Sequence, residues 1–200
     1  VEEVHAVGRL AGSAQAQEWG DLAETHPPVL HTHDRYGHRI DEVRYDPSYH
    51  RLMETAVSFG LHGAAWRDPR PNAHLTRAAR SSVWSVVDAG HGCPISMTYA
   101  VVPALRANAE LAAQYEPLLA SLEYDPSTRP PLEKRGLVAG MSMTEKQGGS
   151  DVRANRTQAT PQPDGSYRIT GHKWFTSAPM SDLLLVLAQA PGGLSCFFLP

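Results

Sequence analysis

The chain has 200 residues, of which 42% are hydrophobic and 20% are charged, a composition typical of a folded globular protein. Its formal charge of −3 at pH 7 disfavours a nucleic-acid-binding domain, which is normally basic. The longest apolar run, residues 183–188, is too short to cross a bilayer, and the first residues lack the basic start and apolar stretch of a secretory signal. We therefore expect a cytoplasmic protein that makes no membrane contact.

Helices are expected first along the chain. Asp46-Pro47 is a typical helix start, because Asp caps free N–H groups and Pro is tolerated at the first helical position. A second helix is predicted over 72–87, with Arg77 and Arg80 on its polar side. Further helices are predicted over 95–107, kinked or ended early by Pro103, and over 109–122, broken or restarted at Pro117. The apolar face expected for the second helix consists of Leu75, Ala78, Ala79, Ser82, Val83 and Val86.

The pattern changes to strands after the proline-rich segment 124–131. Strands are predicted at residues 137–143, 157–160, 167–170, 183–189 and 194–199, with a hairpin turn at Pro163-Asp164-Gly165. Helices followed by strands in separate blocks indicate α+β architecture. We expect a helical domain over 1–135 and a β-domain over 136–200. The final apolar strand should pair with one that follows it, so we expect the sequence to be the leading part of a longer chain.

Glycine and hydroxyl residues cluster directly after the first predicted strand, at Thr144, Gly148, Gly149 and Ser150. Two adjacent glycines let the backbone approach a ligand closely, and the hydroxyls add donors suited to a phosphate or to a polar ring edge. An ordinary turn, with Ser150 or Asp151 capping the next short helix, explains the same residues. Composition alone favours the turn.

Two motifs here resemble those of acyl-CoA dehydrogenases. The segment Thr144-Glu145-Lys146-Gln147-Gly148-Gly149-Ser150-Asp151 resembles the signature that opens the β-domain of that family. Some twenty residues later, Gly171-His172-Lys173-Trp174-Phe175-Thr176-Ser177 resembles the second family signature. The resemblance implies an N-terminal all-α domain, an antiparallel β-barrel or sandwich, and a C-terminal helical bundle beyond Pro200. It also implies bound FAD and a homotetramer.

The resemblance also implies particular cofactor contacts. Thr144 would bond the polar edge of the isoalloxazine ring, and Ser150 would lie against the pyrophosphate. Phe175 would cover one flavin face, and Ser177 would reach the ring near N5. The cofactor-binding residues expected in this way are Met143, Thr144, Gly149, Ser150, Phe175, Thr176 and Ser177.

The pair Lys146-Gln147 departs from the usual family motif and resembles the AidB branch, whose members act in the bacterial response to DNA alkylation. Two functions follow as expectations: α,β-dehydrogenation of an acyl-CoA thioester, or protection of DNA with weak or vestigial dehydrogenase activity. The resemblance places both the catalytic base and a surface for double-stranded DNA beyond Pro200. Glu145 is not assigned as the base.

Other chemically suggestive residues have simpler interpretations. His31, His33 and His38 are expected in a polar loop and not at a metal. Arg67, Arg70, Arg77 and Arg80 could contact phosphate, but a solvated helix face is favoured. His91 fits a ligand cavity and an ordinary loop equally well. Trp66 and Trp84 are expected in the core, and Cys93 and Cys196 as free buried thiols, although one disulfide is the alternative.

Overall fold

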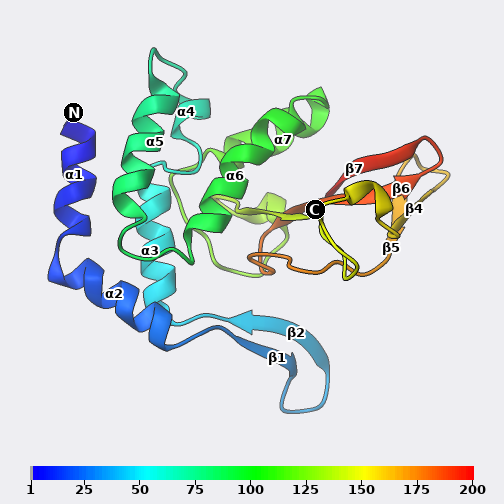
Figure 1. The fold of residues 1–200 in the computed structure, drawn as a ribbon, viewed down its shortest axis with the longest axis horizontal. Coiled ribbons are helices and arrows are strands. Elements are labelled where there is room, and N and C mark those ends of the chain that lie inside the picture. Colours follow the sequence, from blue (N-terminus) through cyan, green and yellow to red (C-terminus); the bar gives the residue numbers. More distant parts are fainter. Residues whose placement is uncertain (1) are drawn as a thin grey trace.

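The computed structural model describes residues 2–200, and it has the α+β architecture that the sequence predicts. Helices occupy one end of the molecule and a sheet the other (Figure 1). The helices are α1 (Glu2–Ala11), α2 (Ala14–Thr25), α3 (Pro47–Ser58), α4 (Ala64–Arg67), α5 (Ala73–Trp84), α6 (Gly92–Leu105) and α7 (Ala109–Leu119), with short 3₁₀ turns at Pro131–Glu133 and Val152–Ala154. The strands are β1 (Val29–His33), β2 (Arg39–Arg44), β3 (Ala139–Ser142), β4 (Gln158–Pro161), β5 (Tyr167–Thr170), β6 (Leu183–Ala190) and β7 (Gly193–Leu199).

Helix α3 begins as predicted, because the Asp46 carboxylate accepts the Ser48 N–H at 2.8 Å. The two internal prolines do not break their helices: α6 continues past Pro103 to Leu105, and α7 continues past Pro117 to Leu119. A proline removes the N–H that would bond the carbonyl four residues earlier. For Pro103 that carbonyl belongs to Tyr99, and it accepts the Trp66 indole N–H at 2.9 Å instead.

The prediction for the buried face of α5 was wrong. Leu75 and Val86 are 68% and 72% exposed. In contrast, Arg80 and Trp84 are buried, with only 9% and 1% of their surface exposed. Helix α5 packs on α1, and Trp84 joins a core cluster with residues of α1 and α3. Arg80 can be buried because an arginine packs its long aliphatic stem against apolar neighbours, so its charge does not mark the solvent-facing side of the helix.

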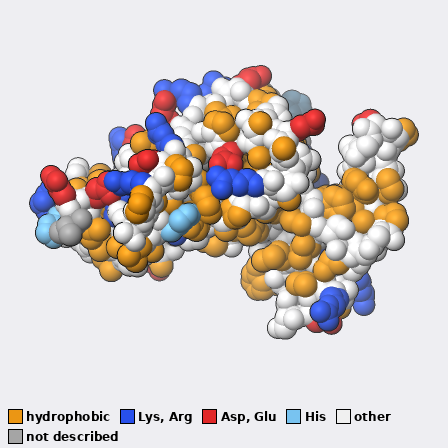
Figure 2. Space-filling model, turned by 90° about the horizontal axis from the view of Figure 1, so that it is seen from above, with side chains coloured by type: hydrophobic (Ala, Val, Ile, Leu, Met, Phe, Trp, Pro, Cys, Tyr) orange, Lys and Arg blue, Asp and Glu red, His pale blue; other side chains and the backbone are white. Residues whose placement is uncertain are grey.

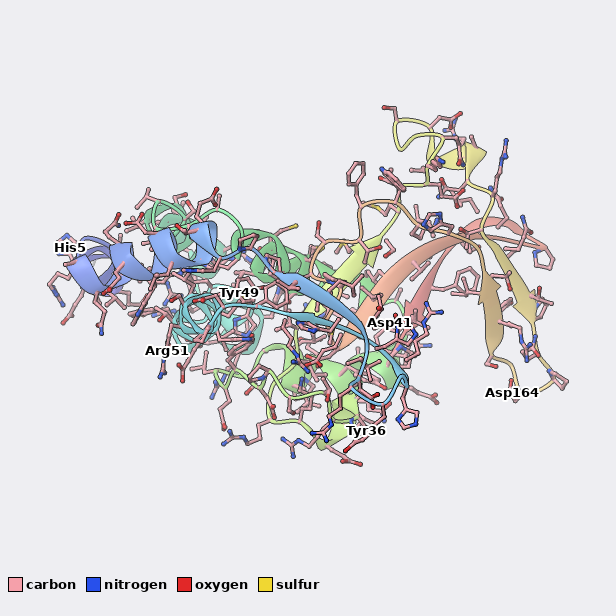
Figure 3. All side chains as sticks on the ribbon, turned by 90° about the horizontal axis from the view of Figure 1, so that it is seen from below. His5, Tyr36, Asp41, Tyr49, Arg51 and Asp164 are labelled. Atoms are coloured by element: carbon pink, nitrogen blue, oxygen red, sulfur yellow. The ribbon has the colours of Figure 1, made fainter. Side chains whose placement is uncertain are left out.

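Residues 29–44 form a β-hairpin of β1 and β2, in place of the polar loop that the sequence predicted at His31, His33 and His38. The strands pair antiparallel from Val29–Arg44 to His33–Arg39, and the Asp34 carboxylate accepts the backbone N–H groups of Tyr36 and His38 in the turn. The hairpin extends from the helices, with Tyr36 near its turn (Figure 3). His33 and His38 are exposed, as expected, but His31 is partly buried, and both His31 and His33 lie on strand β1.

The main sheet has five strands and mixed direction. Strands β6 and β7 pair antiparallel along their whole length, and so do β4 and β5 around the predicted turn. In contrast to the expected antiparallel sheet, β3 and β4 both run parallel to β6. Cys93 and Cys196 are free, as expected, but both are exposed and not buried. Cys196 lies on β7, which pairs only with β6 among the described residues.

Helix α6 and a buried ion pair connect the helices to the sheet. The Thr98 hydroxyl of α6 accepts the Ala139 N–H of β3 at 2.9 Å. Asp182, just before β6, pairs with Lys134 and accepts the Val138 N–H at 2.7 Å. These contacts hold the start of β3, the strand that leads into the first motif, beside the helical part. Within residues 2–200 no helix has the length and apolar character needed to span a membrane.

Candidate functional site

The first motif leaves β3 and turns back on itself. Glu145 and Gly148 form a bridge in which the Gly148 N–H donates to the Glu145 carbonyl at 2.9 Å. Gly148 has a φ of 139°, a conformation that side-chain-bearing residues rarely adopt. Lys146 and Gln147 therefore form the tip of a tight turn, as the glycine pattern indicated.

Glu145 is buried, and its carboxylate holds the turn in place. It accepts the backbone N–H of Arg156 at 2.6 Å, and both the N–H and hydroxyl of Thr157 at 2.9 and 2.6 Å. Lys173 pairs with it at 3.0 Å. Burial by itself would raise the pKa of Glu145, but these hydrogen bonds outweigh it and hold the pKa well below its usual value. A carboxylate bonded in this way anchors the loop and is not available as a catalytic base.

Gly149 packs directly against the Thr144 side chain. A Cβ at position 149 would lie 2.6 Å from the Thr144 hydroxyl oxygen and 3.0 Å from its methyl carbon. Any residue other than glycine at position 149 would displace the Thr144 side chain. The close approach explains why the motif needs glycine at position 149.

The second motif lies against the first. The Trp174 N–H donates to the Thr144 carbonyl at 2.8 Å, and the Thr176 and Ser142 hydroxyls lie 2.8 Å apart. Lys173 adds the ion pair with Glu145. The structure therefore brings together the two segments that the sequence singled out, with their backbones in direct contact.

The joined loops present an aromatic ring and free hydroxyls to solvent. Phe175 is 77% exposed and has a φ of 63°, an uncommon and strained conformation for a bulky residue. Met143 is also exposed, at 49%. Thr144, Ser150 and Ser177 are not fully buried, and their hydroxyls make no hydrogen bond to another residue of the described chain, whereas Thr176 is engaged by Ser142. Hydrophobic side chains gather over this sheet-bearing end, with few charges among them (Figure 2).

A cavity of about 460 Å³ opens beside Ser177, between the second motif and the helices. Tyr45 and Tyr49 form part of it, and their rings stack with centroids 4.2 Å apart. Asp88 and Cys93 line it from the helical side. The mixture of aromatic and polar groups is typical of a small-molecule site.

His91 lies in the turn between α5 and α6, as one of the two interpretations of the sequence predicted, and it does not line this cavity. It is 1% exposed, and its Nδ1 lies 2.8 Å from the Asp88 carboxylate, which also accepts the His91 N–H at 2.9 Å. These hydrogen bonds lower the pKa of Asp88 despite its burial. His91 thus orients a carboxylate that does line the cavity. Trp84 lies in the core as expected, whereas Trp66 is half-buried and stacks on Tyr99 at 5.1 Å.

Comparison with known proteins agrees with this geometry. Residues 1–126 match the model of the adaptive response protein AidB N-terminal domain, and residues 140–200 match the acyl-CoA dehydrogenase middle domain. The chain belongs to the acyl-CoA dehydrogenase family, on its AidB branch. Within that family, it is 48% identical over 200 residues to the putative acyl-CoA dehydrogenase AidB of Escherichia coli, covering 98% of this chain and 36% of that protein.

Solved structures support the same assignment to the acyl-CoA dehydrogenase family. Caenorhabditis elegans ACDH-11 in complex with C11-CoA superposes with a TM-score of 0.80 at 26% identity, over 93% of this chain and 33% of that one. An acyl-CoA dehydrogenase complexed with FAD from Bacillus anthracis shares the fold, with a TM-score of 0.64 at 20% identity, over 98% and 30% of the two chains. The chain thus spans about a third of the length of these relatives.

Two residues that support the joined motifs are not apparent from the sequence. The Asn155 side chain donates to the Met143 carbonyl at 2.8 Å, and Thr157 supplies two of the donors to Glu145. Both lie between the motifs, where nothing in the local pattern marks them. Their buried polar character becomes visible only once the strands are paired.

Proposed function

We propose that this chain binds FAD at the two joined motifs and belongs to an enzyme that removes hydrogen from the α and β carbons of an acyl-CoA thioester. The observation that carries the proposal is the surface built by Phe175, Thr144 and Ser177. It combines an exposed aromatic ring in a strained conformation with hydroxyls that lack a partner. An energetically unfavourable conformation of this kind is commonly retained where a ligand is bound.

The residues fit a flavin. Phe175 offers a flat apolar face for a ring, and Thr144 and Ser177 offer donors for its polar edges. Ser150 and the backbone beside Gly149 offer donors for a pyrophosphate. Met143 and Thr176 are the remaining residues that the sequence predicts to bind the cofactor, and we include them in the proposed site.

Bound FAD would accept a hydride from the β carbon of the thioester. The Ser177 hydroxyl would donate a hydrogen bond where negative charge develops on the reduced ring, which favours the transfer. Phe175 would exclude water from one ring face. The cavity beside Ser177 would hold the acyl part of the substrate, with Tyr45 and Tyr49 as its apolar wall. The base that removes the α proton is proposed to lie beyond residue 200.

Two features of relatives support this proposal. The ACDH-11 structure contains C11-CoA, an acyl-CoA thioester. The fold relative from Bacillus anthracis contains FAD. We also propose that the intact protein is a homotetramer. Light scattering, which measures the mass of the assembly in solution, tests this.

FAD binding to the intact protein tests the proposal directly. We expect the purified protein to be yellow, and the variant F175A to weaken FAD binding at least tenfold, or about 1.4 kcal/mol. The matched control is Y36A, since Tyr36 is an aromatic residue of similar exposure, 71%, in the turn of the β1–β2 hairpin and outside both motifs. Absence of FAD binding, or equal affinities of F175A and Y36A, would overturn the proposal.

Protection of DNA during the adaptive response is a second candidate, favoured by the match of residues 1–126 to the adaptive response protein domain. The net charge of −3 indicates that the DNA contact lies outside this part of the protein. Two measurements separate the candidates: bleaching of the flavin by a panel of acyl-CoAs, and binding of duplex DNA at several salt concentrations. Affinity that falls steeply with salt supports protection, and absent or salt-independent binding argues against it.

A further inference from the structure

Of the four arginines between residues 67 and 80, Arg67 and Arg70 are exposed, as the sequence predicts, whereas Arg77 and Arg80 are not. Arg77 is half-buried: its Nε donates to the Leu61 carbonyl at 2.6 Å, and its guanidinium lies 3.9 Å from the centre of the Tyr99 ring. Arg67, Arg70 and Arg80 instead line one cavity of about 270 Å³, between α1, α4 and the start of α5. The structure therefore separates one structural arginine from three that share a cavity.

Arg80 is the most unusual of these three. It is only 9% exposed, and its Nε atom is buried without a hydrogen-bond partner among the described residues. The nearest carboxylate oxygen, on Glu3, lies 3.9 Å from its Nη1, which is too long for a hydrogen bond. A buried guanidinium normally has its donors satisfied, because an unmet charged donor costs free energy. Arg80 thus lines the cavity with a guanidinium that has an unmet donor among residues 2–200.

The rest of the cavity has a positive balance. Ala73, the first residue of the twelve-residue helix α5, lines it, and the cap residue Asn72 makes no side-chain bond to the helix end. The positive end of the helix dipole thus lies at the cavity. Two carboxylates oppose the three arginines: Glu3, 2.8 Å from Arg70, and Asp68, 3.4 Å from the same side chain.

We propose that this cavity binds a phosphate group, either as inorganic phosphate or as the head of a small phosphomonoester. The planar guanidinium of Arg80 would supply parallel donors to two phosphate oxygens, and Arg70 and Arg67 would neutralise the remaining charge. Glu3 pairs with Arg70 and would compete with the anion for it. Hydrocarbon from Phe59 and Leu122 lines the cavity as well, and would contact the carbon part of an ester.

Calorimetric titration of the intact protein with inorganic phosphate and with glycerol 3-phosphate, at constant ionic strength set with NaCl, tests this proposal. We expect one site per chain with a Kd of about 1 mM or lower. The variant R80K keeps the charge but loses the planar fork, and should weaken binding at least tenfold. The matched control R39M removes an exposed arginine of the hairpin and should leave affinity unchanged.

The variant E3Q distinguishes a ligand site from a structural ion network. Removing a competing carboxylate should tighten phosphate binding several-fold. If Glu3 and the arginines only attach α1 to the fold, E3Q lowers the unfolding temperature and leaves phosphate affinity absent or unchanged, which overturns the proposal. Equal affinities of R80K and R39M overturn it too. Tighter binding of glycerol 3-phosphate than of phosphate assigns the site to an ester, and the reverse order assigns it to the free ion.

Discussion

Lys173 and Glu145, 28 residues apart in sequence, form a buried ion pair of 3.0 Å that ties the second motif to the first. Their side chains are only 10% and 4% exposed. The pair therefore belongs to the architecture of the proposed flavin site and not to its chemistry. Removing this ion pair should lower the free energy of unfolding, because neither side chain belongs to the proposed contacts with the ligand.

We expect E145Q to lower the free energy of unfolding at pH 7 by about 3 kcal/mol, because Lys173 would remain charged and buried without its partner. Urea unfolding monitored by circular dichroism measures the change. The control is E42Q, which removes a partly exposed carboxylate paired with the exposed Arg44 and should cost under about 1 kcal/mol. Equal losses in the two variants would contradict the anchoring role.

The effect of E145Q should depend on pH. Because folding lowers the pKa of Glu145, its stabilisation is complete above the usual value of 4.5 and disappears as the pH falls below it. The difference in unfolding free energy between the natural protein and E145Q should stay constant from pH 7 to about 5 and narrow at lower pH. A difference that is independent of pH down to about 3.5 would show that folding does not lower the pKa of Glu145, and would contradict this prediction.

His62 should make the folded state sensitive to mild acid. It is 2% exposed, and its Nε2 donates to the Ser121 carbonyl at 2.8 Å. Burial lowers its pKa from 6.5 to about 4, so its stabilisation is complete above pH 6.5 and is lost between pH 6.5 and 4. The loss at pH 4 should be on the order of 3 kcal/mol. Unfolding of H62Q across this range should show a shallower pH dependence, whereas H33Q, at an exposed histidine, should match the natural protein.

Gly149 and Thr144 should behave as a coupled pair. In G149A the new Cβ meets the Thr144 side chain, so we expect a loss of about 1–3 kcal/mol of stability and weaker FAD binding. The double variant T144A/G149A removes the atoms that clash, and should recover most of the stability without recovering FAD affinity. Fluorescence titration with FAD and urea unfolding measure the two quantities. Recovery of both would show that the Thr144 hydroxyl does not contact the cofactor.

Local patterns predicted much of the fold correctly. Asp46 and Pro47 start a helix through a bond within three residues, and Pro163-Asp164-Gly165 makes a turn between neighbouring strands. Both features depend on atoms close together in the chain. The hairpin at residues 29–44 escaped prediction because its strands are exposed on both faces and show no clear alternation.

The sequence by itself determined the order of helices and strands, the family, and the two motifs with their glycines, since all of these depend on residue types at short spacing. Only the tertiary structure decided which face of α5 is buried, that Arg80 lacks an acceptor, and that Glu145 is an anchor. These depend on which distant segments pack together, and therefore on which polar groups lose water and which partners replace it. The same packing leaves Phe175 strained and exposed, and leaves the hydroxyls of Thr144 and Ser177 without a hydrogen-bond partner among the described residues.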